Sequence, residues 1–239
     1  MFRRIGILAI VILLGLIAAQ ALTQSPQKTA NMTDQELKEK IDSLAKLEQP
    51  LSAAKFIAEA KKRAKATHDT PWMLDIINTE IELNSRRLAR SSSVEEEYEK
   101  AIKDAWTPLT HALRFAQFTH TGNNSFLAPL LADADQLFNF SAKEIGAENR
   151  WMASRNALDY IATHIAVSYS SDDSQKAQAV DILERQAKAH SDTTSQIIAT
   201  ALRVIINSDE SLQEALTDSL LAIPATSPEQ KAIVNFVRA

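Results

Sequence analysis

Cysteine is absent from the 239-residue chain. Without a thiol, the protein has no disulfide framework and no cysteine nucleophile. It also cannot be processed as a lipoprotein, because a lipoprotein carries its acyl chain on a cysteine. These absences exclude disulfide-stapled secreted domains, cysteine hydrolases and acylated envelope proteins.

Glycine is scarce, with four residues in the chain and only Gly122 and Gly146 after residue 21. Phosphate-binding loops, tight hairpins and barrel corners need glycine for a positive φ or for close approach of the backbone. The composition therefore argues against nucleotide-binding loops and all-β folds. Ala, Leu, Lys, Glu and Gln are abundant instead, and these residues favour helix.

Basic residues are outnumbered, with 26 Lys and Arg against 30 Asp and Glu, a formal net charge of −4. The densest basic group, residues 61–65, follows Glu59 in an expected helix and is typical of a solvated helix face. Proteins that bind nucleic acid need Lys and Arg to neutralise phosphates. We therefore expect no nucleic-acid partner.

One long apolar run exists, at residues 5–19, between Arg3-Arg4 and the small-residue pattern Ala19-Gln20-Ala21. This order is typical of a secretory signal peptide, here residues 1–21, cleaved after Ala21. The alternative is an uncleaved N-terminal anchor. A helix of this length, at about 1.5 Å per residue, covers only about 22 Å of a hydrocarbon core that is roughly 30 Å thick. We therefore expect export to the bacterial periplasm or cell surface.

Helix-start signals recur after a polar leader at residues 22–31, which we expect to be flexible. Capping boxes occur at Thr33, Ser93 and Ser141, and a proline follows Thr70 and Ser227 at the first helical position. Together with apolar residues at helical spacing, these signals predict one helical domain over residues 32–239. The predicted helices are 33–47, 50–67, one from 70, 93–106, a kinked or restarted 107–119, 127–138, 141–146, 150–168, and four starting near 172, 192, 208 and 227.

Residues 119–126 form the clearest loop and a candidate subdomain boundary, with Gly122 suited to a left-handed helix C-cap. In the second half, helix starts recur at the spacing of short antiparallel helix pairs. This spacing predicts an all-α fold of helical hairpins, either an αα-solenoid with tetratricopeptide-like architecture or an irregular helical bundle.

Catalytic and metal-binding patterns are weak. His111 and His120, with Asp133 or Asp135, are the candidate metal ligands, although exposed or helix-end histidines explain them better. The acidic run at residues 95–99 fits the first turns of a helix, where negative charge favours the macrodipole. No serine lies in a nucleophile motif. We expect no catalytic residue, no metal and no cofactor.

Aromatic residues at helical spacing are typical of a core, as is His164 beside an apolar stripe. Phe115, Phe118 and Phe126 bracket the 119–126 loop. They are the candidate residues for contact with a partner protein.

Residues 37–90 contain Ile41-Asp42-Ser43-Leu44 and Pro50-Leu51-Ser52-Ala53-Ala54. This stretch resembles the helical N-terminal region of bacterial alpha-2-macroglobulin-like proteins, which are exported, non-enzymatic protease traps. The chain lacks the β-domains and the thioester Cys-x-Glu-Gln of that family. The resemblance therefore implies a related helical module and not protease trapping.

The sequence favours an exported, non-catalytic helical-repeat protein that binds or scaffolds another envelope or extracellular protein. Contact with the membrane is expected only through an uncleaved N-terminal segment. Two alternatives stay open: a hydrolase acting on the cell wall, and a periplasmic carrier of a small hydrophobic ligand.

Overall fold

The computed structural model describes residues 29–87, 94–147, 150–168 and 171–238. These residues form helices joined by turns, with one isolated antiparallel bridge between Ser141 and Asn156 and no strand in the described part. The predicted all-α fold is confirmed. The predicted signal peptide, most of the leader and the capping residue Ser93 lie outside the described residues. Within the described ranges, no helix is long and apolar enough to cross a membrane.

The chain divides into two compact units, one ending at Thr67 and one beginning at His68. The division does not fall at residues 119–126, which lie inside the second unit. The predicted loop there is wrong in extent, because α7 (Thr107–Thr121) and η1 (Asn124–Phe126) leave only residues 122–123 between them. The helix that precedes this loop is buried along most of its length, so the loop joins elements of one core.

The first unit is a hairpin of α3 (Asp34–Lys46) and α4 (Pro50–Thr67). The predicted capping box is present, because the Thr33 hydroxyl accepts from the Glu36 amide and the Glu36 carboxylate accepts from the Thr33 amide. Arg63 of α4 ties down the start of α3 by donating to Met32 O at 2.7 Å and Asp34 Oδ1 at 2.9 Å. The buried residues that join the two helices are Leu37, Ile41, Leu44, Ala53, Phe56, Ile57, Ala60 and Ala64.

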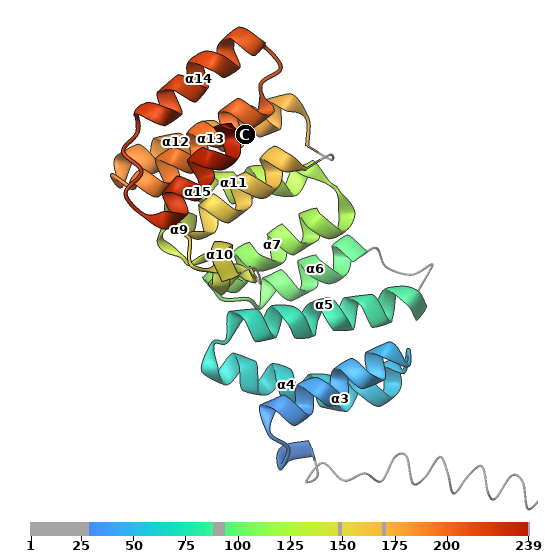
Figure 1. Cartoon of the computed structure of the whole chain (residues 1–239). Coiled ribbons are helices and arrows are strands. Elements are labelled where there is room, and N and C mark those ends of the chain that lie inside the picture. Colours follow the sequence, from blue (N-terminus) through green and yellow to red (C-terminus); the bar gives the residue numbers. More distant parts are fainter. Residues whose placement is uncertain (1–28, 88–93, 148–149, 169–170, 239) are drawn as a thin grey trace, which may run out of the picture. The chain divides into compact units, whose positions relative to one another are not determined.

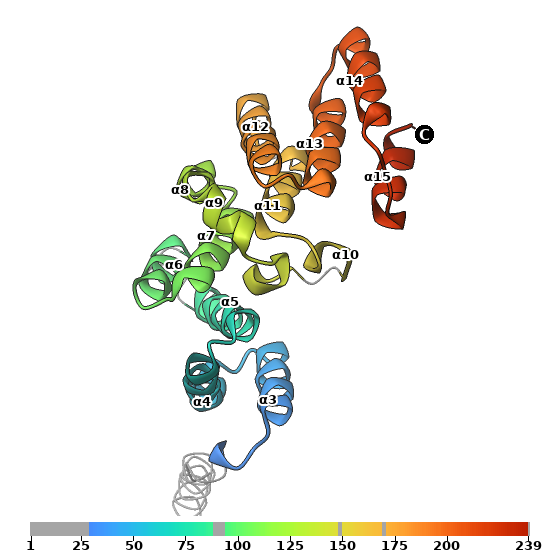
Figure 2. The same ribbon diagram turned by 90° about the vertical axis from the view of Figure 1, so that its left-hand side faces the viewer.

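The second unit is built from successive helices that lie side by side (Figures 1 and 2). Its longer helices are α5 (Thr70–Arg87), α6 (Val94–Lys103), α7 (Thr107–Thr121), α11 (Ala157–Val167), α12 (Asp173–Ala189), α13 (Thr193–Ile206), α14 (Glu210–Ala222) and α15 (Pro228–Arg238). Its short elements are η1 (Asn124–Phe126), α8 (Leu127–Ala132), α9 (Ala134–Asn139), η2 (Ala142–Ile145) and α10 (Arg150–Ala153). From α11 onward each long helix packs against the next, as the spacing of the helix starts predicts.

The core of the second unit includes side chains from α6, α7, α11 and α13. Its largest fully buried side chains include Tyr98, Phe118, Leu158, Ile161 and Ile197. The C-terminal helices extend this core through Leu220 and the half-buried Ile223, Ala225, Ile233, Val234 and Val237. Burial of these apolar side chains is the main source of stability.

Two predicted helices are divided in the structure. The predicted helix 127–138 breaks at Asp133, whose amide donates to Leu130 O in a tight last turn of α8. The predicted helix 150–168 is divided between α10 and α11, because the Asn156 side chain accepts from the Asp159 amide and caps a new helix. The Asn156 break is therefore caused by a local side-chain hydrogen bond, whereas the Asp133 side chain makes no cap hydrogen bond.

Two helix starts are also resolved by the structure. Of the two alternatives at Thr107-Pro108, the structure shows a new helix, preceded by Trp106 in an extended conformation. The helix cap that was predicted at Thr70 is provided by Asp69, whose Oδ1 accepts from the Trp72 amide at 3.1 Å. Thr70 instead accepts a hydrogen bond from the Trp106 indole N–H at 2.8 Å. Aspartate is at least as good an N-cap as threonine, which explains why Asp69 caps α5 in place of Thr70.

Candidate functional site

Phe115 and Phe118 lie in the core, with 5% and 1% of their surfaces exposed. The Phe115 ring meets the Tyr160 and His164 rings of α11 edge to face, at centroid distances of 5.3 and 5.2 Å. Both phenylalanines share the face of α7 that packs against α11. They cannot contact a partner from there, so this prediction is wrong for Phe115 and Phe118.

Phe126 is only partly buried and lines an open groove of about 500 Å³ beside α6. The other residues that line this groove are Glu95, Glu96, Glu99, Lys100, Lys103 and Gln117. Of the three predicted contact residues, Phe126 alone has a place from which it can reach a partner. Its role in binding stays a prediction.

The acidic residues of this groove have two structural roles. Glu95, Glu96 and Glu97 occupy the first turn of α6, as the macrodipole interpretation predicts. The fully buried Gln117 of α7 also donates from Nε2 to the Glu95 carbonyl oxygen and to Glu99 Oε1, both at 3.3 Å. The Glu95 carboxylate accepts from Asn123 Nδ2 at 3.0 Å. These bonds hold α6 to α7 and η1, a role that the sequence did not reveal.

The two candidate histidines are not brought together, although Asp133 lies close enough to His111 to oppose the lowering of its pKa. His111 and His120 are nine residues apart on α7, and at 100° per residue this places them on opposite faces of the helix. His111 is buried against Phe140, and burial lowers its pKa. His120 is exposed, and Asp135 is 3.3 Å from His190. The described residues contain no cluster of three His, Asp or Glu side chains that is arranged to hold a metal ion.

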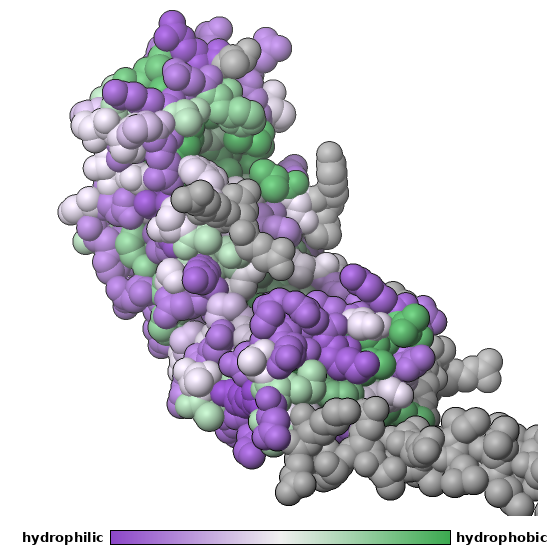
Figure 3. All heavy atoms as spheres, turned by 60° about the horizontal axis from the view of Figure 1, so that its bottom comes forward, coloured by the Kyte–Doolittle hydropathy of each residue, from purple (hydrophilic) through white to green (hydrophobic). Residues whose placement is uncertain are grey.

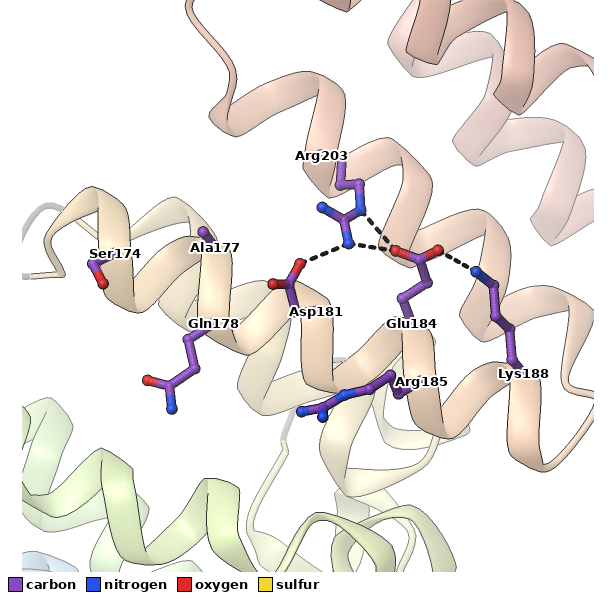
Figure 4. A pocket seen from close by; sticks show the side chains of 8 residues that line it. All are labelled: Ser174, Ala177, Gln178, Asp181, Glu184, Arg185, Lys188 and Arg203. Carbon is purple, nitrogen blue, oxygen red and sulfur yellow. Dashed lines mark hydrogen bonds and ion pairs between the residues drawn. The ribbon is translucent and has the colours of Figure 1, made fainter.

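A second open groove, of about 810 Å³, follows α12 and is lined by charged and polar side chains (Figure 4). Arg203 of α13 reaches across to Asp181 Oδ1 at 2.6 Å and also pairs with Glu184. Lys188 pairs with the same glutamate, and the two cations hold the pKa of Glu184 below its ordinary value. Gln178 and Arg185 extend from the other side of α12 in this view.

This arrangement pairs Asp181, Glu184, Lys188 and Arg203 of the α12 groove with one another. The Glu184–Lys188 spacing is visible in the sequence as an i, i+4 pair. The contribution of Arg203 is not, because it depends on the packing of α13 against α12. An open groove lined by charged and polar side chains is suited to contact with a polar surface, and it offers no enclosed apolar space for a hydrophobic ligand.

Asp159 of α11 is a fully buried carboxylate, with 0% of its surface exposed. Its Oδ2 pairs with Arg155 at 2.7 Å and accepts from the Ser195 hydroxyl at 3.0 Å. Arg155 also pairs with Asp192, the N-cap of α13, at 3.2 Å. This cluster links the starts of α11 and α13.

The cluster is not a nucleophilic site. The Ser195 oxygen accepts from Arg155 at 3.0 Å and from Asn156 at 3.1 Å, so its lone pairs are occupied. Burial raises the pKa of Asp159 to about 6, and Arg155 and Ser195 limit the rise. Burial alone would also raise the pKa of Asp192, but the Ser195 amide and Arg155 outweigh it and lower this pKa. The arrangement holds helices together and presents no activated hydroxyl.

Comparison with protein family models, with curated proteins and with solved structures found no match. The resemblance of residues 37–90 to alpha-2-macroglobulin-like proteins therefore stays a prediction.

Proposed function

We propose that the protein is an exported, non-catalytic helical-repeat module that binds another protein of the bacterial envelope. Export rests on the N-terminal pattern of Arg3-Arg4, the apolar run 5–19 and Ala19-Gln20-Ala21. Binding rests on the surface of the second unit.

The observation that carries the binding proposal is the exposure of large apolar side chains on the last three helices. Phe236 is 75% exposed, and Leu212, Leu221 and Ile205 are each about half exposed. We call these four residues the C-terminal apolar side chains. Figure 3 shows apolar side chains gathered among polar ones over the C-terminal helices, in the upper part of the view. Exposed apolar groups rimmed by polar residues are typical of protein–protein contact sites.

The polar sites of the described residues favour binding over catalysis. Asp159 and Asp192 share the Arg155 guanidinium, Asp181 and Glu184 share that of Arg203, and Glu95 and Glu99 accept hydrogen bonds that hold α6 to its neighbours, so each of these acids already has a structural partner. A glycoside hydrolase needs two carboxyl groups that face a substrate cleft. The α6 and α12 grooves are open and charged, which also makes them unsuitable for a small hydrophobic ligand.

The test is crosslinking and affinity capture from the envelope fraction of the native host. We expect the wild-type protein to capture a specific partner, and the double variant L212S/F236S to lose most of it. The matched control is V167S, which removes an apolar side chain that is 55% exposed on α11. Recovery of no partner above background, or an equal loss with V167S, would overturn the proposal. Fractionation with N-terminal sequencing tests export separately, and a mature chain beginning at Leu22 is the expected result.

A further inference from the structure

The helix α4 of the first unit is strongly basic. It carries five Lys and Arg residues and one acid, Glu59. Arg63 lies 2.9 Å from both Glu59 and Asp34 of α3, so these three charges are paired within the hairpin. The other charged residues of α4 are four lysines, at positions 55, 61, 62 and 65.

Three of these lysines lie on one side of the helix together with a leucine. Their spacing of i, i+4, i+11 and i+14 places them opposite the buried stripe that packs against α3. We call the four residues the α4 basic face: Leu51, Lys55, Lys62 and Lys65. Lys62 and Lys65 are exposed, and no acid among the described residues pairs with either of them.

The basic character of this face contrasts with the rest of the chain. Residues 29–67 contain eight Lys and Arg against six Asp and Glu, whereas residues 68–239 contain 15 against 24. Within the first unit, α3 carries four of the six acids, and Glu39 and Asp42 lie on its exposed side. Soluble surfaces commonly intersperse the two signs. Here the signs are segregated, so the α4 basic face can meet an anionic surface with no acid on the same stripe.

Two exposed leucines lie at the N-terminal end of this face. Leu47 follows α3 and is 62% exposed, and Leu51 in the first turn of α4 is 75% exposed. Apolar side chains next to lysines suit the surface of a bilayer. The leucines can enter the interfacial region while the lysine ammonium groups stay at the level of the lipid phosphates.

The position of the hairpin in the chain also points to a membrane. Only residues 22–31 separate the hairpin from the apolar signal segment of residues 1–21. Ten fully extended residues reach at most about 35 Å, so an uncleaved segment would keep the hairpin at the bilayer surface. With cleavage, the exported chain is still released beside that surface. This step rests on the export that we propose above.

We propose that the α4 basic face binds the anionic surface of a lipid bilayer. Its lysines pair with lipid phosphates, and Leu51 enters the interface. Clusters of four or more basic residues on an amphipathic helix are typical of proteins that recognise anionic lipids. The contact adds to the sequence-based expectation, in which only an uncleaved N-terminal segment touches the membrane. It does not involve the C-terminal apolar side chains.

The test is cosedimentation of residues 22–239, the product of the predicted cleavage, with lipid vesicles. The vesicles contain phosphatidylcholine alone or with about one third phosphatidylglycerol, at low and at high salt. We expect binding to the anionic vesicles alone, and its loss at high salt because salt screens the lysine charges. K62Q/K65Q should lower the partition coefficient about 25-fold, since each lysine near an anionic surface contributes about fivefold.

The matched control is K103Q/K231Q, which removes the same charge from two exposed lysines of the second unit and should bind as wild type does. L51S should weaken binding severalfold and leave its salt dependence unchanged. Equal binding to the two kinds of vesicle, or equal losses in the two lysine variants, would overturn the proposal.

Two further results separate this proposal from others. L212S/F236S should bind vesicles as wild type does, so the proposed binding of an envelope protein can fail without affecting lipid binding. The α4 basic face could instead meet an acidic protein. In that case wild type would not bind anionic vesicles, and K62Q/K65Q would lose a protein captured from the envelope fraction. That pair of results would overturn the assignment to lipid.

Discussion

Gly146 provides a prediction that separates backbone strain from packing. It ends η2 with φ +93°, a conformation that residues with a side chain rarely adopt. A β-carbon at this position would lie 2.5 Å from Cδ2 of the buried Leu74 in α5. Gly122 is the matched comparison, since it ends α7 with φ +65° but is exposed.

The two substitutions should therefore differ in cost. An alanine in the left-handed region costs roughly 1–2 kcal/mol, and this cost applies to both glycines. Overpacking a core adds typically about 1–3 kcal/mol, and this cost applies to Gly146→Ala alone. We expect Gly146→Ala to destabilise the second unit by about 2–5 kcal/mol and to lower its Tm by roughly 10 °C.

The assay is thermal and urea unfolding followed by far-ultraviolet circular dichroism, with Leu74→Ala as a second background. Removing the Leu74 side chain removes the atom that a β-carbon would meet. Gly146→Ala should then cost no more than Gly122→Ala. The packing argument fails if the two glycine variants cost the same in the wild-type background, or if Leu74→Ala gives Gly146→Ala no relief.

Further predictions follow from the core and its ion pairs. Leu158→Ala should cost about 2–5 kcal/mol in urea unfolding because its side chain is fully buried, and a cost below 1 kcal/mol would contradict that position. Arg155→Ala should lower the free energy of unfolding by about 3–5 kcal/mol because it leaves the buried Asp159 unpaired. Arg203→Ala at the open α12 groove should lower it by less than about 1 kcal/mol. Equal losses in the two variants would refute this distinction. His164 has a pKa lowered by burial, so its stabilising contribution is complete above about pH 6.5 and is lost as the pH falls. His164→Phe should therefore lose less stability between pH 7.5 and 5.0 than wild type does, and an identical loss would refute this role.

Many helix ends could be predicted because the residues that cap a helix lie within a few positions of its end in the sequence. The Thr33 and Ser141 capping boxes and the left-handed Gly122 are local features, and the structure contains all three. The breaks at Asp133 and Asn156 were missed because the apolar period continues across both, and only Asn156 caps a new helix through its side chain. The periodic pattern records which face is buried, and it is less sensitive to where a helix restarts.

The surface features were less predictable because they depend on packing between distant parts of the sequence. Phe118 and Phe126 flank the same loop, yet one faces α11 and the other lines a groove. Arg155 and Asp192 are 37 residues apart, and nothing local indicates that they meet. The exposed apolar residues of α14 and α15 look like ordinary helix stripes in the sequence. They are exposed because, among the described residues, no other helix covers the sides of α14 and α15 on which they lie.

The most direct test of the proposed binding function is photocrosslinking from a single position in the native envelope. A photoreactive phenylalanine analogue replaces Phe236, and the same analogue at the exposed Lys143 of η2 serves as the control. We predict a discrete adduct with one envelope protein from position 236 and none from position 143. The absence of an adduct from position 236, or the same set of adducts from both positions, would contradict the proposal.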